Sequence, residues 1–162
     1  MRDTARLDVP YPAEGPISQA ALAGLRRVTV EREGRRLIDG LSLGLPPDGI
    51  TVIMGANGAG KSVCLRLLHG LIAPDDGQVT WRDRPLDDAA RRQQSLVFQK
   101  PVLLRRSAGA NIDFVLKARG RHDPARRDAL LAHVGLGDHA GRPARSLSGG
   151  EQQRLALARA LA

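Results

Sequence analysis

The sequence predicts an α/β fold in which an N-terminal β part precedes a helical part. Short segments that alternate between apolar and polar residues, separated by turn sequences, occupy residues 25–54. The apolar run Gly49–Met54 is followed by a glycine-rich loop and by a helical pattern that begins at Lys61. From Ser107 onward, helix start and stop signals dominate the sequence. These three observations define the predicted fold class.

Length and composition indicate one folded domain, with or without a small inserted subdomain. The chain has 162 residues, of which 42% are hydrophobic and 26% are charged. Cys64 is the only cysteine, so an intrachain disulfide is excluded and a reducing compartment is favoured. No stretch approaches the roughly 18 apolar residues of a membrane span, and residues 1–20 carry no signal-peptide pattern. We therefore expect the protein to stay in the cytoplasm.

The net charge of +8 comes mainly from arginine. Many of the arginines form adjacent pairs: Arg26-Arg27, Arg35-Arg36, Arg91-Arg92, Arg105-Arg106 and Arg126-Arg127. Such a surface suits phosphate-bearing partners or an anionic membrane surface, whereas solvated polar faces are the simpler interpretation.

Regular structure is expected to begin at residue 23. Residues 1–22 lack strand or helix periodicity and predict a flexible tail. The next three segments are predicted strands, the third of them buried: Leu25–Glu31, Leu37–Leu45 and Gly49–Met54. Turns are predicted at Glu33-Gly34 and at residues 46–49.

Helices alternate with two further strands in the rest of the chain. A helix with apolar residues at Val63, Leu65, Leu67, Leu68 and Leu71 is predicted to run from Lys61 to about Gly70. Two strands should follow, at Gln78–Trp81 and at Ser95–Gln99. Three more helices are predicted: one within Ser107–Lys117, one with Asp123 as N-cap, Pro124 at its first position and Gly135 as its stop, and one that begins near Ser148.

The loop between the third strand and the first helix carries the clearest functional signal. Its eight residues match the pattern G-x-x-x-x-G-K-[ST]: Gly55, Ala56, Asn57, Gly58, Ala59, Gly60, Lys61 and Ser62. Glycines let successive backbone N–H groups point into one concavity that binds phosphate oxygens, and the start of the helix adds a positive potential. Lys61 should reach the β- and γ-phosphates of ATP, and the Ser62 hydroxyl should bind Mg²⁺.

A second anion site is predicted at the start of the last helix. Ser148 and Glu151 form an S-x-x-E capping box, which would start a helix without any ligand. Gly149 and Gly150 leave the first N–H groups of this helix uncovered. Together, residues 147–154 (LSGGEQQR) resemble the signature of the ABC ATPase family.

This resemblance implies a P-loop NTPase (RecA-like) core with an N-terminal antiparallel β subdomain and an inserted helical subdomain. Residues 23–99 would form the β subdomain and phosphate-loop core, residues 100–146 the helical subdomain, and residues 147–162 the signature and its helix. In the family, two ATP-binding subunits form a head-to-tail dimer that encloses two ATP molecules. Ser148, Gly149 and Gly150 would then contact the γ-phosphate bound to the other subunit. Gln99 matches the family's catalytic glutamine, which senses Mg²⁺ and the attacking water.

The segment from Val97 to Ser107 is similar to bacterial importer subunits, including those for oxyanions such as tungstate or molybdate. The implied partners are membrane-spanning transporter subunits and a solute-binding protein, on the inner face of the cell membrane. Val102, Leu103 and Leu104 are expected to be exposed and to offer an apolar surface to a partner helix. Nucleic acid is not an expected partner in this interpretation.

The sequence departs from the family at two places. Glu31-Arg32-Glu33-Gly34 stands where an aromatic residue usually stacks on adenine; Arg32 could stack instead, and a solvated arginine is an equal alternative. After the signature, residues 152–162 contain no Asp, Glu or His, so the family's metal-holding Asp, water-orienting Glu and switch His are not found. We therefore expect a truncated domain that lacks the C-terminal part of its sheet and does not hydrolyse ATP.

Two alternatives to a transporter subunit remain at this point. A non-transport ABC ATPase that acts on ribosomes or nucleic acid would agree with the basic charge. A truncated pseudo-cassette that only binds nucleotide would agree with the absent catalytic residues.

Overall fold

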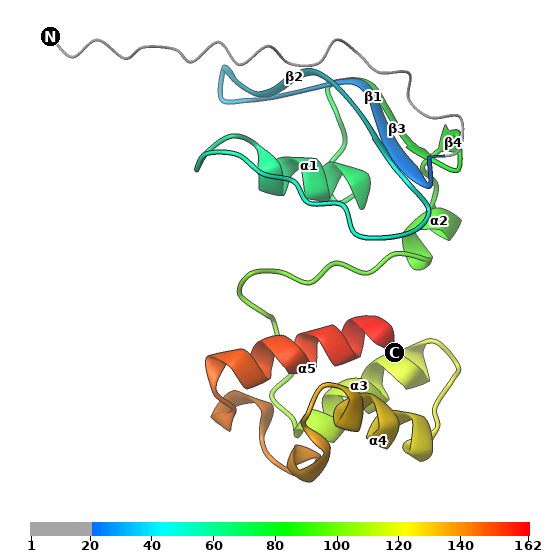
Figure 1. Ribbon diagram of the computed structural model, residues 1–162, viewed down its shortest axis with the longest axis vertical. Coiled ribbons are helices and arrows are strands. Elements are labelled where there is room, and N and C mark those ends of the chain that lie inside the picture. The colour runs from blue at the N-terminus through cyan, green and yellow to red at the C-terminus, as the bar shows by residue number, and fades with distance from the viewer. Residues whose placement is uncertain (1–20) are drawn as a thin grey trace, which may run out of the picture. The chain divides into compact units, whose positions relative to one another are not determined.

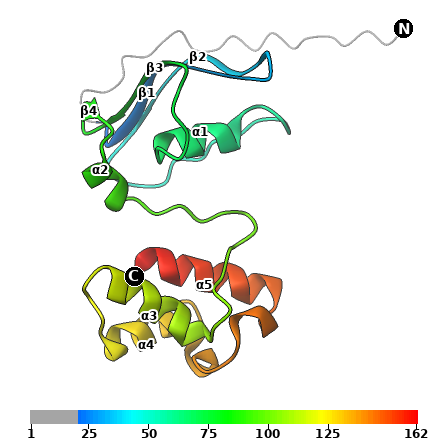
Figure 2. The same cartoon turned by 180° about the vertical axis from the view of Figure 1, so that it is seen from behind.

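The computed structural model describes residues 21–162, which form two compact units (Figure 1, Figure 2). The first unit extends to Gln94, and the second spans Ser95–Ala162. Each has a hydrophobic core of its own, so each is described by itself. Of the predicted tail, residues 1–22, the first 20 residues lie outside the described part of the chain. At its end, the Leu22 amide donates a hydrogen bond to the Leu45 carbonyl (2.8 Å).

An antiparallel sheet with the strand order β2-β1-β3-β4 forms the first unit. Its strands are β1 (Ala23–Arg32), β2 (Arg35–Leu45), β3 (Asp76–Trp81) and β4 (Arg84–Pro85). Glu33 and Gly34 connect β1 to β2, and both have a positive φ (53° and 71°), as a two-residue type I′ turn requires. The strands predicted at residues 25–31, 37–45 and 78–81 are confirmed.

Helix α1 (Lys61–Leu68) packs on one face of this sheet (Figure 1). The shared core contains Ala23, Leu25, Val28, Val30, Ile38, Cys64, Leu67, Leu68 and Val79. Burying each large aliphatic side chain stabilises the unit by about 1.5–3 kcal/mol. Leu65 and Leu71, predicted to lie on the apolar face, are instead half exposed. The short helix α2 (Asp88–Arg92) follows β4, with Asp87 as its N-cap.

Two predicted strands are wrong. Residues 49–54 and 95–99 form no strand and pair with no strand among the described residues. Ile50, Val52 and Met54 are consequently exposed (93%, 71% and 86%). A strand exists through hydrogen bonds to a neighbouring strand, and an apolar run does not by itself supply that neighbour.

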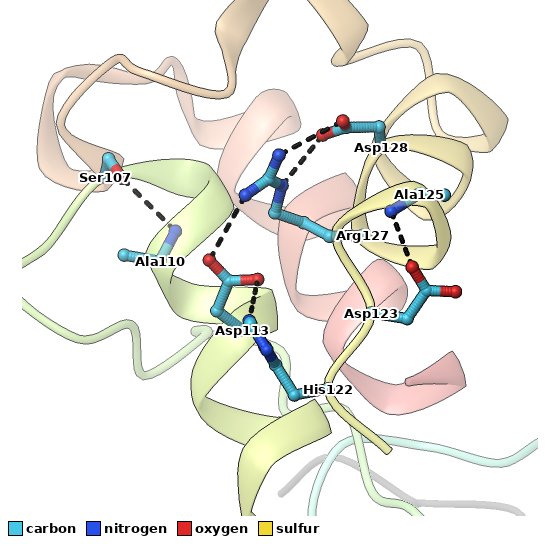
Figure 3. A network of polar contacts seen from close by, with 8 residues as sticks. All are labelled: Ser107, Ala110, Asp113, His122, Asp123, Ala125, Arg127 and Asp128. Carbon is cyan, nitrogen blue, oxygen red and sulfur yellow. Dashed lines mark hydrogen bonds and ion pairs between the residues drawn. The ribbon is translucent and has the colours of Figure 1, made fainter.

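Three helices and two short 3₁₀ turns form the second unit. They are α3 (Ala108–Ala118), α4 (Pro124–His133), η1 (Gly137–His139), η2 (Ala144–Ser146) and α5 (Gly149–Leu161). The predicted N-cap Asp123 is confirmed, because its side chain accepts a hydrogen bond from the Ala125 amide (Figure 3). Ser107 caps α3 in the same way by accepting from the Ala110 amide. Gly135, the predicted stop of α4, has a φ of 68°.

Apolar side chains from all three helices meet in the core of the second unit. Those with 0% exposure are Ala108, Ile112, Leu116, Leu131, Leu136, Ala144, Leu155 and Ala158. Leu103 packs against this core and Leu104 is only partly exposed, so the predicted apolar surface is wrong except at Val102, which is 79% exposed. Within residues 21–162, no helix combines the length and the apolar character that a membrane crossing needs.

Candidate functional site

The glycine-rich loop Gly55–Ser62 leads directly into α1. Gly55, Gly58 and Gly60 have φ values of 153°, 84° and 83°, a region that favours glycine. At Gly60 a Cβ would lie 2.9 Å from the Leu37 carbonyl oxygen, so both the backbone angle and the space require glycine. The loop therefore has the conformation that its glycines predict.

The Lys61 side chain is held over this loop by two carbonyl groups of the loop backbone. Its Nζ donates hydrogen bonds to the carbonyl oxygens of Gly55 and Ala56, both at 2.7 Å. An ammonium group has three donors, so one remains for a ligand. The positive charge is thereby fixed beside the turn.

The donors around the loop fit a phosphate chain. Helix α1 has no side-chain cap at Gly60 and no acidic residue in its first turn, so its first N–H groups and its dipole are uncompensated. Ser62 is exposed and contributes one hydroxyl. No group of three or more Asp, Glu, His or Cys side chains within residues 21–162 could hold a metal ion. Magnesium would thus need phosphate oxygens besides Ser62.

The predicted capping box at the start of α5 is present. Ser148 Oγ accepts a hydrogen bond from the Glu151 amide (3.3 Å), and Glu151 Oε2 accepts one from the Ser148 amide (2.7 Å). His139 Nε2 lies 3.4 Å from Glu151 Oε1, a contact that the sequence did not indicate because η1 has no periodicity that relates it to α5. Hydrogen bonding with the Ser148 side chain and amide lowers the pKa of Glu151, and the charges of His139 and Arg142 also lower it.

Gly149 and Gly150 have no structural reason within the second unit to be glycine. Neither has a positive φ. A Cβ would meet open space at Gly149, and at Gly150 only the Arg154 guanidinium, 3.9 Å away. Glycine in a helix is less favourable than alanine by about 1 kcal/mol. Small residues at these exposed positions suit the close approach of a ligand to the N–H groups of the helix start.

The Glu151 cap should make stability depend on pH. The pKa of Glu151 is lower in the folded than in the unfolded chain, so its contribution is fully present above the unfolded value of about 4.3 and is lost as the pH falls through the folded value. We expect Glu151→Gln to lower the melting temperature at neutral pH, and this difference to shrink below about pH 4.3. Thermal unfolding followed by circular dichroism measures it, with Glu33→Gln in the β1–β2 turn as control. A difference between Glu151→Gln and the parent that stays constant with pH would contradict this linkage.

Gln99 lies in the irregular segment that precedes α3, and it is exposed. Its carbonyl oxygen accepts a hydrogen bond from Gln153 Nε2 of α5. The second unit therefore brings Gln99 next to the helix that begins with the signature residues Ser148, Gly149 and Gly150. The loop Gly55–Ser62 belongs to the first unit. Gln153 belongs to the signature segment 147–154, but the sequence analysis assigned it no role.

Arg32 has a defined partner in the first unit. Its Nη1 forms an ion pair with Asp75 Oδ2 (2.9 Å) and donates a hydrogen bond to the Glu31 carbonyl (2.6 Å). The hydrogen bond from the Glu31 amide to Asp75, together with the charge of Arg32, lowers the pKa of Asp75. Between the two alternatives for Arg32, this geometry favours a surface ion pair over a free guanidinium that stacks on a base.

Most of this chain is similar in sequence to known proteins. The family model described as ABC transporter matches residues 38–162. The Fe(3+) ions import ATP-binding protein of Streptomyces coelicolor is 40% identical in an alignment of 148 positions that covers 88% of this chain and 42% of that protein. The tungstate uptake system ATP-binding protein of Peptoclostridium acidaminophilum is 38% identical over 132 residues, 80% of this chain and 61% of that protein.

Export is also represented among the relatives. The cytochrome c biogenesis ATP-binding export protein of Methylococcus capsulatus is 38% identical over 139 residues, 80% of this chain and 65% of that protein. The chain thus spans about half the length of the curated relatives it matches.

A solved structure confirms the predicted fold. CbiO1 from Clostridium perfringens, described as part of the ABC transporter complex CbiONQ, superposes with a TM-score of 0.74. Its sequence is 23% identical, and the match covers 88% of this chain and 61% of that one. The family match over residues 38–162, together with these relatives, shows that this chain belongs to the ABC transporter family.

Proposed function

We propose that this chain is the ATP-binding part of an ABC importer, with ATP and Mg²⁺ as its ligands. One observation carries the proposal: the chain holds two separate helix starts at which backbone N–H groups have no side-chain partner, although the capping box at α5 engages the Glu151 amide. One is the glycine loop before α1, and the other is Ser148-Gly149-Gly150 at α5. A single nucleotide needs only one such cradle, so the second is best explained by a nucleotide bound to another copy of the domain.

Each residue of the proposed site has a separate role. The backbone of Gly55–Gly60 would surround the β-phosphate, and Lys61 would use its remaining donor on the β- and γ-phosphates. Bound Mg²⁺ would neutralise charge on the phosphates. Ser62 would hold that ion, with Gln99 as a further ligand that also orients water. Ser148, Gly149 and Gly150 would close over the γ-phosphate bound to the partner chain in a head-to-tail dimer.

The proposed partners follow from this role. They are a second ATP-binding subunit, membrane-spanning transporter subunits and a solute-binding protein, with the chain on the cytoplasmic face of the membrane. Relatives named for iron and tungstate import support an importer. The iron and tungstate relatives have almost the same sequence identity to the chain, 40% and 38%. We therefore propose no particular solute and no oxyanion group.

We further propose that residues 1–162 bind ATP without hydrolysing it. No carboxylate follows Glu151 in these residues, so none can take the metal-holding and water-orienting roles expected after the signature. Purified residues 1–162 should bind a fluorescent ATP analogue and release phosphate no faster than buffer does. Magnesium-dependent phosphate release that Lys61→Ala abolishes would contradict this proposal.

The transport role is tested by the partners that the protein selects. After gentle extraction of membranes, the tagged protein should co-purify with a subunit that has several membrane-spanning helices. Salt-sensitive co-purification with ribosomal RNA, in place of such a subunit, would instead favour the non-transport alternative.

A further inference from the structure

The arginine pair Arg105-Arg106 differs from the other four pairs of the chain. In each of the others, one member forms an ion pair: Arg26 with Asp83, Arg36 with Asp39, Arg91 with Asp88, and Arg127 with Asp113 and Asp128. Within residues 21–162, neither Arg105 nor Arg106 has a carboxylate within ion-pair distance. These two side chains therefore carry charge that the described part of the chain does not neutralise.

Both arginines line a pocket to which a distant segment adds a third. The pocket has a volume of about 310 Å³ and is lined by Arg105, Arg106, Ser107, Gly141, Pro143 and Arg145. Three arginines thus border one concavity, and its lining contains no carboxylate. Like charges around one pocket repel one another, and an anion bound between them would relieve that repulsion.

The backbone beneath these arginines is firmly held. Ser107 and Pro143 form an isolated antiparallel bridge. The Ala108 amide donates to the Arg142 carbonyl, and the Ala144 amide donates to the Arg106 carbonyl, both at 2.9 Å. Ala108 and Ala144 are completely buried. The two segments that supply the arginines are therefore fixed relative to each other, which lowers the entropic cost of ligand binding.

One acidic residue, Asp113, lies near Arg106, and one of its carboxylate oxygens forms an ion pair elsewhere. Asp113 borders a neighbouring depression with Arg106 and Lys117. Its Oδ2 lies 3.4 Å from Arg127 Nη1, and its Oδ1 lies 3.5 Å from His122 Nε2 (Figure 3). Arg127 is also bound to Asp128 at 2.8 Å. This network directs the Asp113 carboxylate toward Arg127 of α4, and Arg106 borders both the depression that contains Asp113 and the pocket.

We propose that the pocket formed by Arg105, Arg106, Ser107 and Arg145 binds a phosphate group. The planar guanidinium fork matches two oxygens of a phosphate, which makes arginine the preferred residue for this group. Ser107 Oγ accepts a hydrogen bond from the Ala110 amide, so its own proton is available to a phosphate oxygen. The phosphate belongs to a small soluble anion or to a phospholipid headgroup. This site is separate from the glycine loop and does not depend on the proposed ATP-binding role.

The test uses the 162-residue chain with Lys61→Ala, so that the glycine loop contributes little to phosphate binding. Inorganic phosphate is titrated while the Nε–Hε signals of the arginines are followed by nuclear magnetic resonance. We expect saturable shifts at Arg105, Arg106 and Arg145, and at least a tenfold loss of affinity in Arg105→Gln/Arg145→Gln, because each charged hydrogen bond is strong. The control Arg119→Gln/Arg121→Gln removes the same charge from exposed positions of the same unit.

Vesicles of phosphatidylcholine with and without phosphatidic acid form the second arm. Binding to phosphatidic acid that the pocket variant loses and the control retains identifies a lipid headgroup as the source. Loss in the phosphate titration alone identifies a soluble anion. Equal losses in the pocket variant and the control, or phosphate binding that the pocket variant retains, would overturn the proposal. Unchanged circular dichroism of both variants excludes unfolding as the cause.

Discussion

Lys61→Ala is expected to weaken the binding of Mg-ATP about 100-fold or more, since the lost contacts are charge-assisted hydrogen bonds to phosphate. In the structure the ammonium is positioned by the carbonyls of Gly55 and Ala56 before any ligand arrives. The substitution removes both this preorganised charge and its free donor. The backbone N–H groups of the loop remain, so residual binding should persist.

Titration of a fluorescent ATP analogue measures this effect. Lys117→Ala is the matched control, because it removes the same charge from an exposed position on α3. Its affinity should remain within about twofold of the parent. The far-ultraviolet circular dichroism of both variants should be unchanged, because Lys61 makes its contacts to an exposed loop. An affinity of Lys61→Ala close to that of the parent would remove the loop from the proposed site.

Asn111→Ala is expected to destabilise the second unit by about 1–3 kcal/mol, because it leaves the Leu104 amide without its hydrogen-bond partner. Asn111 is completely buried. Its Oδ1 accepts from the Leu104 amide (2.8 Å), and its Nδ2 donates to the carbonyls of Leu104 (3.2 Å) and Ser107 (2.9 Å). One side chain thus attaches the segment before α3 to the helix itself.

Chemical denaturation measures this loss. Asn57→Ala, in the exposed glycine loop, is the control and should change the free energy of unfolding by less than about 0.5 kcal/mol. Asn111→Asp keeps the shape of the side chain but loses the amide donors, so it should also be strongly destabilising. If Asn111→Ala unfolds at the same denaturant concentration as the parent, the segment is held by other contacts.

Local signals in the sequence correctly predicted the turn at Glu33-Gly34, the caps at Asp123 and Ser148 and the conformation of the glycine loop. Gly34 favours a turn because glycine tolerates a positive φ, and the Ser148–Glu151 capping box needs only residues three apart. The glycines of Gly55–Ser62 likewise describe a conformation that the backbone adopts locally. Such features depend on neighbouring residues, so they can be recognised before the fold is known.

The segments 49–54 and 95–99 show where this approach fails. Both have the composition of strands, and both lack a paired neighbour among the described residues. Leu103 and Leu104 were predicted to be exposed. Leu103 instead packs against the core, and the Leu104 amide donates a hydrogen bond to the Asn111 side chain. Pairing and burial of this kind depend on contacts between residues that are distant in the sequence.

By itself, the sequence determined the glycine-rich loop, the capping box at Ser148 and the family to which they belong, because each is a short run of residues with its own backbone chemistry. Only the tertiary structure decided that Lys61 is held by two loop carbonyls and that Arg145 joins Arg105 and Arg106 around one pocket. The structure likewise assigned Arg32 to Asp75. These contacts join residues that are not neighbours in a local sequence pattern. Hydrogen-bond geometry and packing in the folded chain decide which of the many possible partners meet.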